Sequence, residues 1–353
     1  MKRLLLLVLG IAVSAGSLWY AMRDTDTDLV LQAFRTAHYG SLPPILLLLL
    51  AFYWLKAIRF AQLLAPAAPL TARQLFPPVM IGFAANNILP AHLGEFVRVF
   101  VVNRQYRIPA GTVLSSIVLE RIFDIFSILA LFGLGVLFAP AMPENYQRGA
   151  LLAAAAAAGV AVVMIVYMVW TDWFVKTTAQ VFRLLPVIPE SFTGKILTLL
   201  RQGAIGLHSL KSAPAILAIA INSLLQWLIN GYSACLALEA FDIDVTLSTG
   251  LILTGITALG VMIPAAPGYF GVVQVCFQIA LQVQQIKPDP SLVLAASLYS
   301  QIVGYIAVTG TGVWCLNRAQ LSLKDLQEAV DSKPGSHHRP RPCPRSHSCS
   351  LPR

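Results

Sequence analysis

Long uninterrupted apolar stretches are the feature that most constrains how this chain can fold. Several exceed the roughly 18 residues that mark a membrane span, and 57% of the 353 residues are hydrophobic. Charged residues make up only 12%, too few to cover a soluble protein of this size. Because a helix satisfies its own backbone hydrogen bonds in lipid, we expect an all-α polytopic membrane protein.

The apolar stretches give the positions of the expected helices. The first, residues 1–22, is longer than the roughly 7 to 15 residues of a signal-peptide core and ends in Trp19 and Tyr20, so an uncleaved span is preferred to a cleaved signal. Residues 1–320 are expected to form the membrane domain, and residues 321–353 a disordered, basic cytoplasmic tail. The other stretches lie at 41–64, 75–102, 110–139, 149–170, 214–238, 248–283 and 291–317.

Two of these stretches contain helix-breaking residues near their middle. The breaks lie at residues 89–95 (LPAHLGE) and at residues 263–271 (IPAAPGYFG). Proline removes a backbone donor and glycine admits turns, so each stretch is expected to bend into a hairpin. Residues 90–99 and 264–273, aligned without gaps, are identical at five of ten positions. The two breaks therefore resemble each other.

The charge distribution indicates that both hairpins return to the side from which they start. In that arrangement most Lys and Arg residues fall on one side, including five between residues 171 and 213 and two in the 103–109 loop. The positive-inside rule then places both termini in the cytoplasm of a multi-pass protein of the cell (inner) membrane. The result is about six full spans plus two re-entrant hairpins that enter from opposite sides, as in an inverted repeat.

Ionisable side chains inside the expected spans are the strongest indication of function, because each costs at least ~2.5 to 3.5 kcal/mol near the bilayer centre. A rise of ~1.5 Å per residue places Glu120 and Asp124 near mid-membrane, with Glu95 and Arg98 of the first hairpin at a comparable depth. Glu120 and Asp124 share one helix face and would repel without a cation between them. Arg98 is the expected partner, with Arg121 beside it.

Two interpretations of these charges stay open. They form either a static salt-bridge network that fixes the hairpin to the helix, or a polar cavity for a charged lipid headgroup, which is the preferred reading. In such a cavity arginine binds phosphate, and a carboxylate holds an amine or carries a proton. Asn87 is expected to line the same cavity. Pro267, Gly268 and Gln274 of the second hairpin are expected to line its opposite side, with unpaired backbone groups there.

The remaining features do not indicate a further site. Lys56 and Arg59 lie near the expected cytoplasmic end of a span and are expected to snorkel to the interface. The net charge of +9 is concentrated at span ends and in the tail, so nucleic-acid binding is not expected. None of the five cysteines forms a CxxC pair. No metal site, cofactor or catalytic motif is indicated.

Three stretches carry a resemblance to a known family: ILPAHLGEFVRVFVVNR, SSIVLERIFDIFSIL and MIPAAPGYFGVVQ. They resemble the flippase-like membrane domain of lysylphosphatidylglycerol synthases, over about residues 1–320. The resemblance implies a bacterial or archaeal membrane protein associated with moving aminoacylated or glycan-bearing lipids. His92 and Gln274 depart from the family pattern, in which a basic and an acidic residue are common, and this leaves the headgroup open. By position, the resemblance nominates Glu95, Arg98, Glu120, Arg121 and Asp124.

These observations predict a lipid flippase or transporter that moves a polar-headed lipid through a charged cavity in mid-membrane. The lysyl-transferring soluble half of the bifunctional relatives is absent from the sequence, so synthesis of the lipid is not expected. One alternative is a membrane-embedded enzyme or accessory subunit of a lipid-linked sugar or lipid-modification pathway, with the paired acids as acid and base. Another is a scaffold for a lipid-modifying complex. A membrane lipid is the expected substrate, and a lipid-modifying enzyme would be the natural protein partner.

Overall fold

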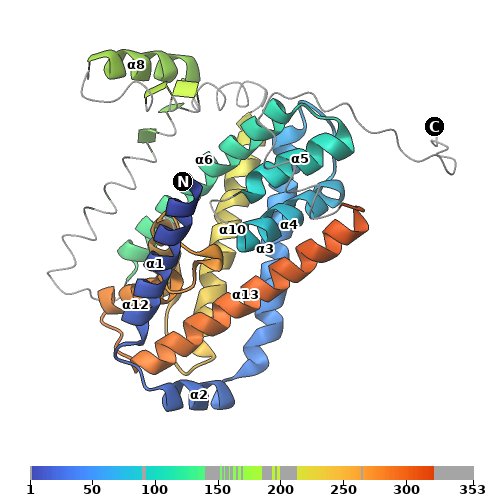
Figure 1. The fold of residues 1–353 in the computed structure, drawn as a ribbon. Coiled ribbons are helices and arrows are strands. Elements are labelled where there is room, and N and C mark those ends of the chain that lie inside the picture. The colour runs from blue at the N-terminus through green and yellow to red at the C-terminus, as the bar shows by residue number, and fades with distance from the viewer. Residues whose placement is uncertain are drawn as a thin grey trace.

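The computed structural model describes residues 2–89, 93–139, 170–184, 213–263 and 265–321, with isolated residues between 152 and 198. Every regular element in these segments is a helix (Figure 1), which confirms the all-α class. Within them three helices are long and apolar enough to cross a membrane: Tyr39–Leu64, Pro214–Glu239 and Pro290–Arg318. The expected span at 149–170 lies largely outside the described residues, as does nearly all of the predicted tail.

Four helices of the first half form one packed unit, and their ends follow local sequence signals. A capping box at Gln74 starts α4 (Ala72–Ile88). This helix ends at Leu89, which is extended and precedes a proline. Helix α3 (Leu42–Leu64) has two prolines in its first turn, where their missing N–H groups are not needed for hydrogen bonds. The helices are α3 (Leu42–Leu64), α4 (Ala72–Ile88), α5 (Gly94–Tyr106) and α6 (Ala110–Leu137).

Helices α4 and α5 form an antiparallel pair, called the first hairpin. Near its tip the Gly94 N–H donates to Asn86 Oδ1 at 2.8 Å, and near its base the Tyr106 hydroxyl donates to the Gln74 carbonyl at 2.8 Å. A Cβ on Gly94 would overlap the carbonyl oxygen of Gly82. Glycine at position 94 therefore permits the close approach of the two backbones.

Four helices of the second half form a similar unit. In the second hairpin, α11 and α12 are joined by η2, and Thr249 Oγ1 donates to Gln284 Oε1 at 3.0 Å across its base. Gly268 and Gly271 have φ angles of +81° and +91°, which glycine adopts without strain. The elements are α10 (Ala213–Glu239), α11 (Leu247–Gly260), η2 (Pro267–Tyr269), α12 (Val272–Val283) and α13 (Pro290–Arg318).

The two units pack against each other through helices of both. Helix α4 lies on α13, α6 lies on α11 and α3 lies on α10. The tip of the second hairpin reaches the first hairpin, because η2 contacts α4. The Tyr305 hydroxyl of α13 also donates to the Asn87 carbonyl of α4, at 3.4 Å. The tip of the second hairpin therefore lies against a helix of the first hairpin.

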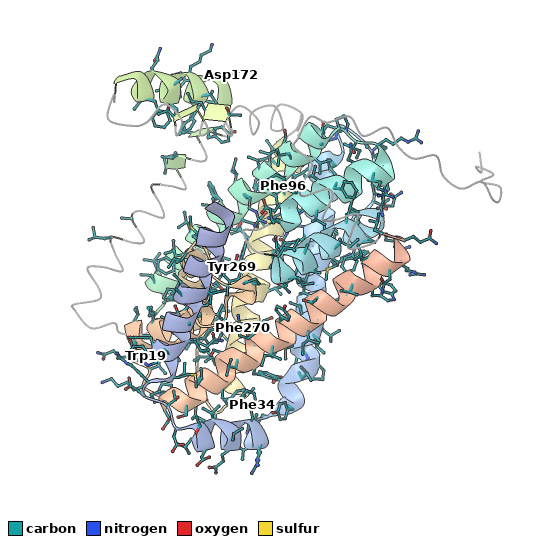
Figure 2. The ribbon with its side chains drawn as sticks, viewed as in Figure 1. Trp19, Phe34, Phe96, Asp172, Tyr269 and Phe270 are labelled. Atoms are coloured by element: carbon teal, nitrogen blue, oxygen red, sulfur yellow. The ribbon has the colours of Figure 1, made fainter. Side chains whose placement is uncertain are left out.

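Three further helices surround these units. Helix α1 (Lys2–Met22) packs on α12, and α2 (Thr27–Thr36) crosses one end of the bundle against α13 (Figure 1). Phe34 lies on α2 (Figure 2), and it packs edge-on against Phe241 with ring centroids 5.5 Å apart. Helix α8 (Thr171–Leu184) lies at the opposite end of the molecule from α2 (Figure 1).

Candidate functional site

Five charged side chains from three helices meet inside the first unit and form what we call the ion network. Arg59 and Glu120 are 0% exposed, and the other three are at most 3% exposed. The members are Lys56 and Arg59 of α3, Arg98 of α5, and Glu120 and Asp124 of α6. Lys56 and Arg59 are thus buried, and the prediction that they snorkel to the interface is wrong. They lie on the face of α3 that packs against α6.

Glu120 is approached by three cations of the network. Arg98 Nη2 donates to Glu120 Oε2 at 2.6 Å. Arg59 Nη2 lies 3.3 Å from Oε1 of the same carboxylate, and Lys56 Nζ lies 3.9 Å from it. The first hairpin and α3 are therefore both tied to α6 at this residue.

Asp124, one turn further along α6, joins α3 to α10. Arg59 Nη1 donates to Asp124 Oδ1 at 2.8 Å, and Trp227 Nε1 donates to the same oxygen at 2.8 Å. Lys56 Nζ lies 3.5 Å from Asp124 Oδ2. Arg59 Nη1 also donates to the Ser223 hydroxyl at 2.7 Å. Arg59 and Lys56 thus lie between the two carboxylates, which would otherwise repel each other.

Aromatic rings cover the cations of the network. Lys56 Nζ lies 5.0 Å from the Phe52 ring centroid and 5.5 Å from that of Trp227. The Arg98 guanidinium lies 3.6 Å from the ring centroid of Phe60. These are cation–π distances, so the rings add to the stabilisation of the buried cations.

Glu95 and Arg121 form a rim pair at the more accessible edge of the network. Arg121 Nη2 lies 2.6 Å from Glu95 Oε1, and their side chains are 39% and 28% exposed. Arg121 Nη1 also lies 3.8 Å from Asp124 Oδ2. With the rim pair included, four cations face three carboxylates. The cluster therefore carries one unit of excess positive charge.

Some polar atoms of the network have no hydrogen-bond partner among the described residues. They are the Nε atoms of Arg59 and Arg98, Nη2 of Arg59, and Oε1 of Glu120. Unpaired buried polar atoms cost roughly 1–3 kcal/mol each, and more when they are charged. Two of these atoms, Arg59 Nη2 and Glu120 Oε1, face each other only as an ion pair at 3.3 Å.

The remaining predicted site residues do not join the ion network. Asn87 and Gly268 line a separate cavity of about 340 Å³, which we call the neutral cavity. Gln274 accepts a hydrogen bond from the Gly271 N–H at 2.6 Å and donates to Gln301 at 2.6 Å, so it holds the start of α12. Pro267 is exposed in η2. The single cavity predicted from the sequence is thus divided into a charged cluster and a neutral space.

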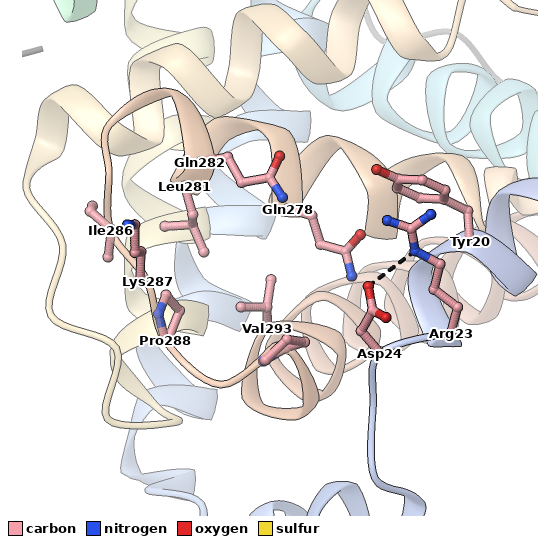
Figure 3. Close-up of a pocket in the computed structure, with 11 residues that line it drawn as sticks. Tyr20, Arg23, Asp24, Gln278, Leu281, Gln282, Ile286, Lys287, Pro288 and Val293 are labelled. Atoms are coloured by element: carbon pink, nitrogen blue, oxygen red, sulfur yellow. Dashed lines mark hydrogen bonds and ion pairs between the residues drawn. The ribbon is translucent and has the colours of Figure 1, made fainter. Parts of the chain in front are cut away.

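The neutral cavity contains residues that sequence reasoning missed. Asn230 of α10, Thr254 of α11 and both Gln301 and Tyr305 of α13 line it. Each is a polar residue in an apolar helix, and this was the only available signal. A second pocket, of about 190 Å³, lies between the end of α1 and α12, where Arg23 Nε donates to Asp24 at 3.0 Å (Figure 3). None of the predicted site residues lines it.

Comparison with known families identifies the membrane unit. The family model described as the lysylphosphatidylglycerol synthase TM region matches residues 7–312. The chain belongs to this family. The lysylphosphatidylglycerol synthase TM region includes both hairpins, the ion network and the neutral cavity. The resemblance expected from the three sequence stretches is therefore confirmed.

One curated protein shares a low sequence identity with this chain. The chain is similar to "Glycosyltransferase AglD" of Haloferax volcanii, with 21% identity over 290 residues. The similar region covers 73% of this chain but only 46% of the relative. No solved structure matches the chain.

Proposed function

We propose that this protein is a lipid flippase that moves a polar headgroup across the cytoplasmic membrane while the acyl chains stay in lipid. One observation carries the proposal: η2, at the tip of the second hairpin, contacts α4 of the first hairpin, in a molecule that holds both a buried ion network and a cavity. Continuous helices would offer the headgroup no free backbone groups inside the membrane. Broken helices supply backbone and side-chain groups there.

The proposed topology has six full spans and two re-entrant hairpins in an inverted repeat, with both termini cytoplasmic. The contacts support it. Arg59 beside Ser223 and Phe52 beside Trp227 make α3 and α10 antiparallel. Asn87 beside Thr309 and Ala84 beside Gly312 make α4 and α13 antiparallel. These directions support a second unit that repeats the order of the first with the helix directions reversed. The spans that follow the two hairpins align at residues 113–116 (VLSS) and 293–296 (VLAA).

The ion network supplies the switching element in this proposal. It joins the first hairpin to α3, α6 and α10, so a movement of the hairpin requires ion pairs to break. The excess positive charge favours the approach of a lipid phosphate, which arginine binds through two parallel hydrogen bonds. The rim pair Glu95–Arg121 is the accessible part and the proposed first point of contact. The flippase thus exchanges protein ion pairs for a phosphate contact.

A second candidate function is a membrane-embedded enzyme or accessory subunit of a lipid-linked sugar pathway. The name of the Haloferax relative, a glycosyltransferase, favours it. The geometry favours it less, because Glu120 and Asp124 are both buried and engaged by cations. A general acid or base must reach the proton that it transfers. We therefore place lipid chemistry in a partner enzyme.

Reconstitution tests the proposal directly. Purified protein in vesicles with tail-labelled lipid in one leaflet should equilibrate the label between leaflets, and a membrane-impermeant quencher measures this. Glu120→Gln and Arg98→Met should slow the movement at least about tenfold, whereas Arg35→Met, at an exposed site on α2, should not. Equal rates in empty and protein-containing vesicles would overturn the proposal. Chemical conversion of the lipid would establish the enzyme instead.

A further inference from the structure

The neutral cavity differs from the ion network in the chemistry of its walls. We propose that it binds the uncharged, hydroxyl-rich part of a lipid headgroup, such as a glycosyl or polyol group, whereas a phosphate of the same lipid would contact the ion network. This inference rests on the proposed flippase function and names its substrate class. Its volume of about 340 Å³ lies within the roughly 300–1,000 Å³ typical of small-molecule sites.

The lining combines apolar rings with neutral hydrogen-bonding groups. Among the described residues that line it, none is charged. Amides and hydroxyls both donate and accept hydrogen bonds, as do the hydroxyls of a sugar or a polyol. The polar members include Asn87, Asn230, Ser233, Thr254, Gln301 and Tyr305.

Hydrogen bonds within the walls hold several of these groups in place. Gln301 donates to the Gly268 carbonyl and accepts from Gln274 at 2.6 Å. Thr254 Oγ1 lies 3.5 Å from Asn230 Oδ1. A wall that is fixed before binding loses less conformational entropy when the headgroup arrives. The cavity is therefore preorganised on its α11, η2 and α13 sides.

The surroundings of the cavity disfavour an amine. A lysyl headgroup carries two ammonium groups, and burying them without carboxylate partners is costly. Glu120 and Asp124 are already engaged by Arg98, Arg59 and Lys56. The ring of Phe52, which lines the cavity, also contacts the Lys56 ammonium. An incoming cation would thus approach a cluster with excess positive charge.

The proposed repeat accounts for the position of the cavity. In the alignment of residues 113–116 with 293–296, Ser300 takes the place of Glu120 and Gly304 takes the place of Asp124. Both Ser300 and Gly304 line the neutral cavity. The first unit therefore fills this position with charged side chains, whereas the second leaves it open and neutral. Two related positions have acquired different roles.

Equilibrium binding in phosphatidylcholine nanodiscs tests the substrate class without requiring transport. The full-length protein is titrated with tail-labelled glucosyl-diacylglycerol, phosphatidylglycerol and lysylphosphatidylglycerol. We expect at least one of the two lipids without an amine to bind about tenfold more tightly than the lysyl lipid. Preference for the glucosyl lipid identifies a glycosyl head, and preference for phosphatidylglycerol identifies a polyol head.

Cavity variants locate the binding. Asn230→Leu and Thr254→Val should each weaken binding of the preferred lipid about three- to tenfold, the effect of one lost hydrogen bond. Gln282→Leu is the matched control, because Gln282 is exposed on α12 and outside the neutral cavity. Equal or tighter binding of the lysyl lipid, or no effect of both cavity variants, would overturn the inference. Selective binding without transbilayer movement would overturn the flippase function and leave this site standing.

Discussion

Arg98, on the returning arm of the first hairpin, donates a hydrogen bond of 2.6 Å to Glu120 of α6. Both side chains are almost fully buried, so neither can exchange its partner for water. Breaking a buried ion pair by removing one partner typically costs about 3–5 kcal/mol, because the other charge is left uncompensated. The link therefore makes the position of the hairpin depend on the charge state of α6.

This pair predicts a charge-rescue pattern. Glu120→Gln leaves Arg98, Arg59 and Lys56 facing Asp124 alone, so it should lower the free energy of unfolding by about 3–5 kcal/mol. Adding Arg98→Met to Glu120→Gln should recover part of that loss. Thermal unfolding in detergent measures both, with Arg35→Met as the exposed control. A double variant less stable than Glu120→Gln alone would contradict the buried ion pair between Arg98 and Glu120.

The two cations of α3 should differ in importance. Arg59 makes a 2.8 Å hydrogen bond to Asp124, whereas Lys56 lies 3.5 Å from the same residue. Because the cluster has one excess positive charge, Lys56→Met should cost at most about 1 kcal/mol of unfolding free energy, and Arg59→Met about 3–5 kcal/mol. The same unfolding assay compares them. Equal losses would show that Lys56 is needed to balance the carboxylates.

The close approach within the first hairpin predicts a sharp steric effect. The Cβ of Gly94→Ala would overlap the Gly82 carbonyl oxygen and lie 2.6 Å from Asn86 Oδ1, so the hairpin must open. Gly111→Ala is the matched control, because a Cβ at Gly111 meets nothing within 4 Å. We expect Gly94→Ala to lose stability by roughly 1–3 kcal/mol and Gly111→Ala to lose none. Similar unfolding curves for the two variants would exclude this contact.

Cysteine labelling tests the proposed re-entrant hairpins. In a variant without native cysteines, Lys287→Cys should react with a membrane-impermeant maleimide from outside the cell, whereas Gln105→Cys should react only after the membrane is opened. Both positions are exposed. Labelling of Gln105→Cys from outside would mean that the first broken stretch crosses the membrane completely.

The sequence predicted the central part of the site because spacing alone placed it. Glu120 and Asp124 share a helix face, and counting the rise from the helix start placed them at the depth of Arg98. The burial of Lys56 and Arg59 could not be predicted in the same way. A cation near the end of a span points either to the interface or inward, and the packing of α3 against α6 and α10 decides between them.

The neutral cavity shows a second limit of sequence reasoning. Asn230, Thr254 and Gln301 lie on three different helices, and each alone is an ordinary polar residue in an apolar segment. Only the packing of α10, α11 and α13 brings them together. Single polar residues carry little information until their neighbours in space are known. Paired charges, in contrast, identify one another by sign and spacing.

The excess positive charge of the four cations and three carboxylates described above gives the proposed flippase a group that a membrane potential acts on. Displacing one elementary charge across the full membrane involves work of roughly 2.3 kcal/mol per 100 mV. Any rearrangement that carries the unbalanced charge part of the way along the membrane normal is therefore sensitive to voltage. In the proposed flippase, the membrane potential would thus favour one of the two positions of the hairpin over the other.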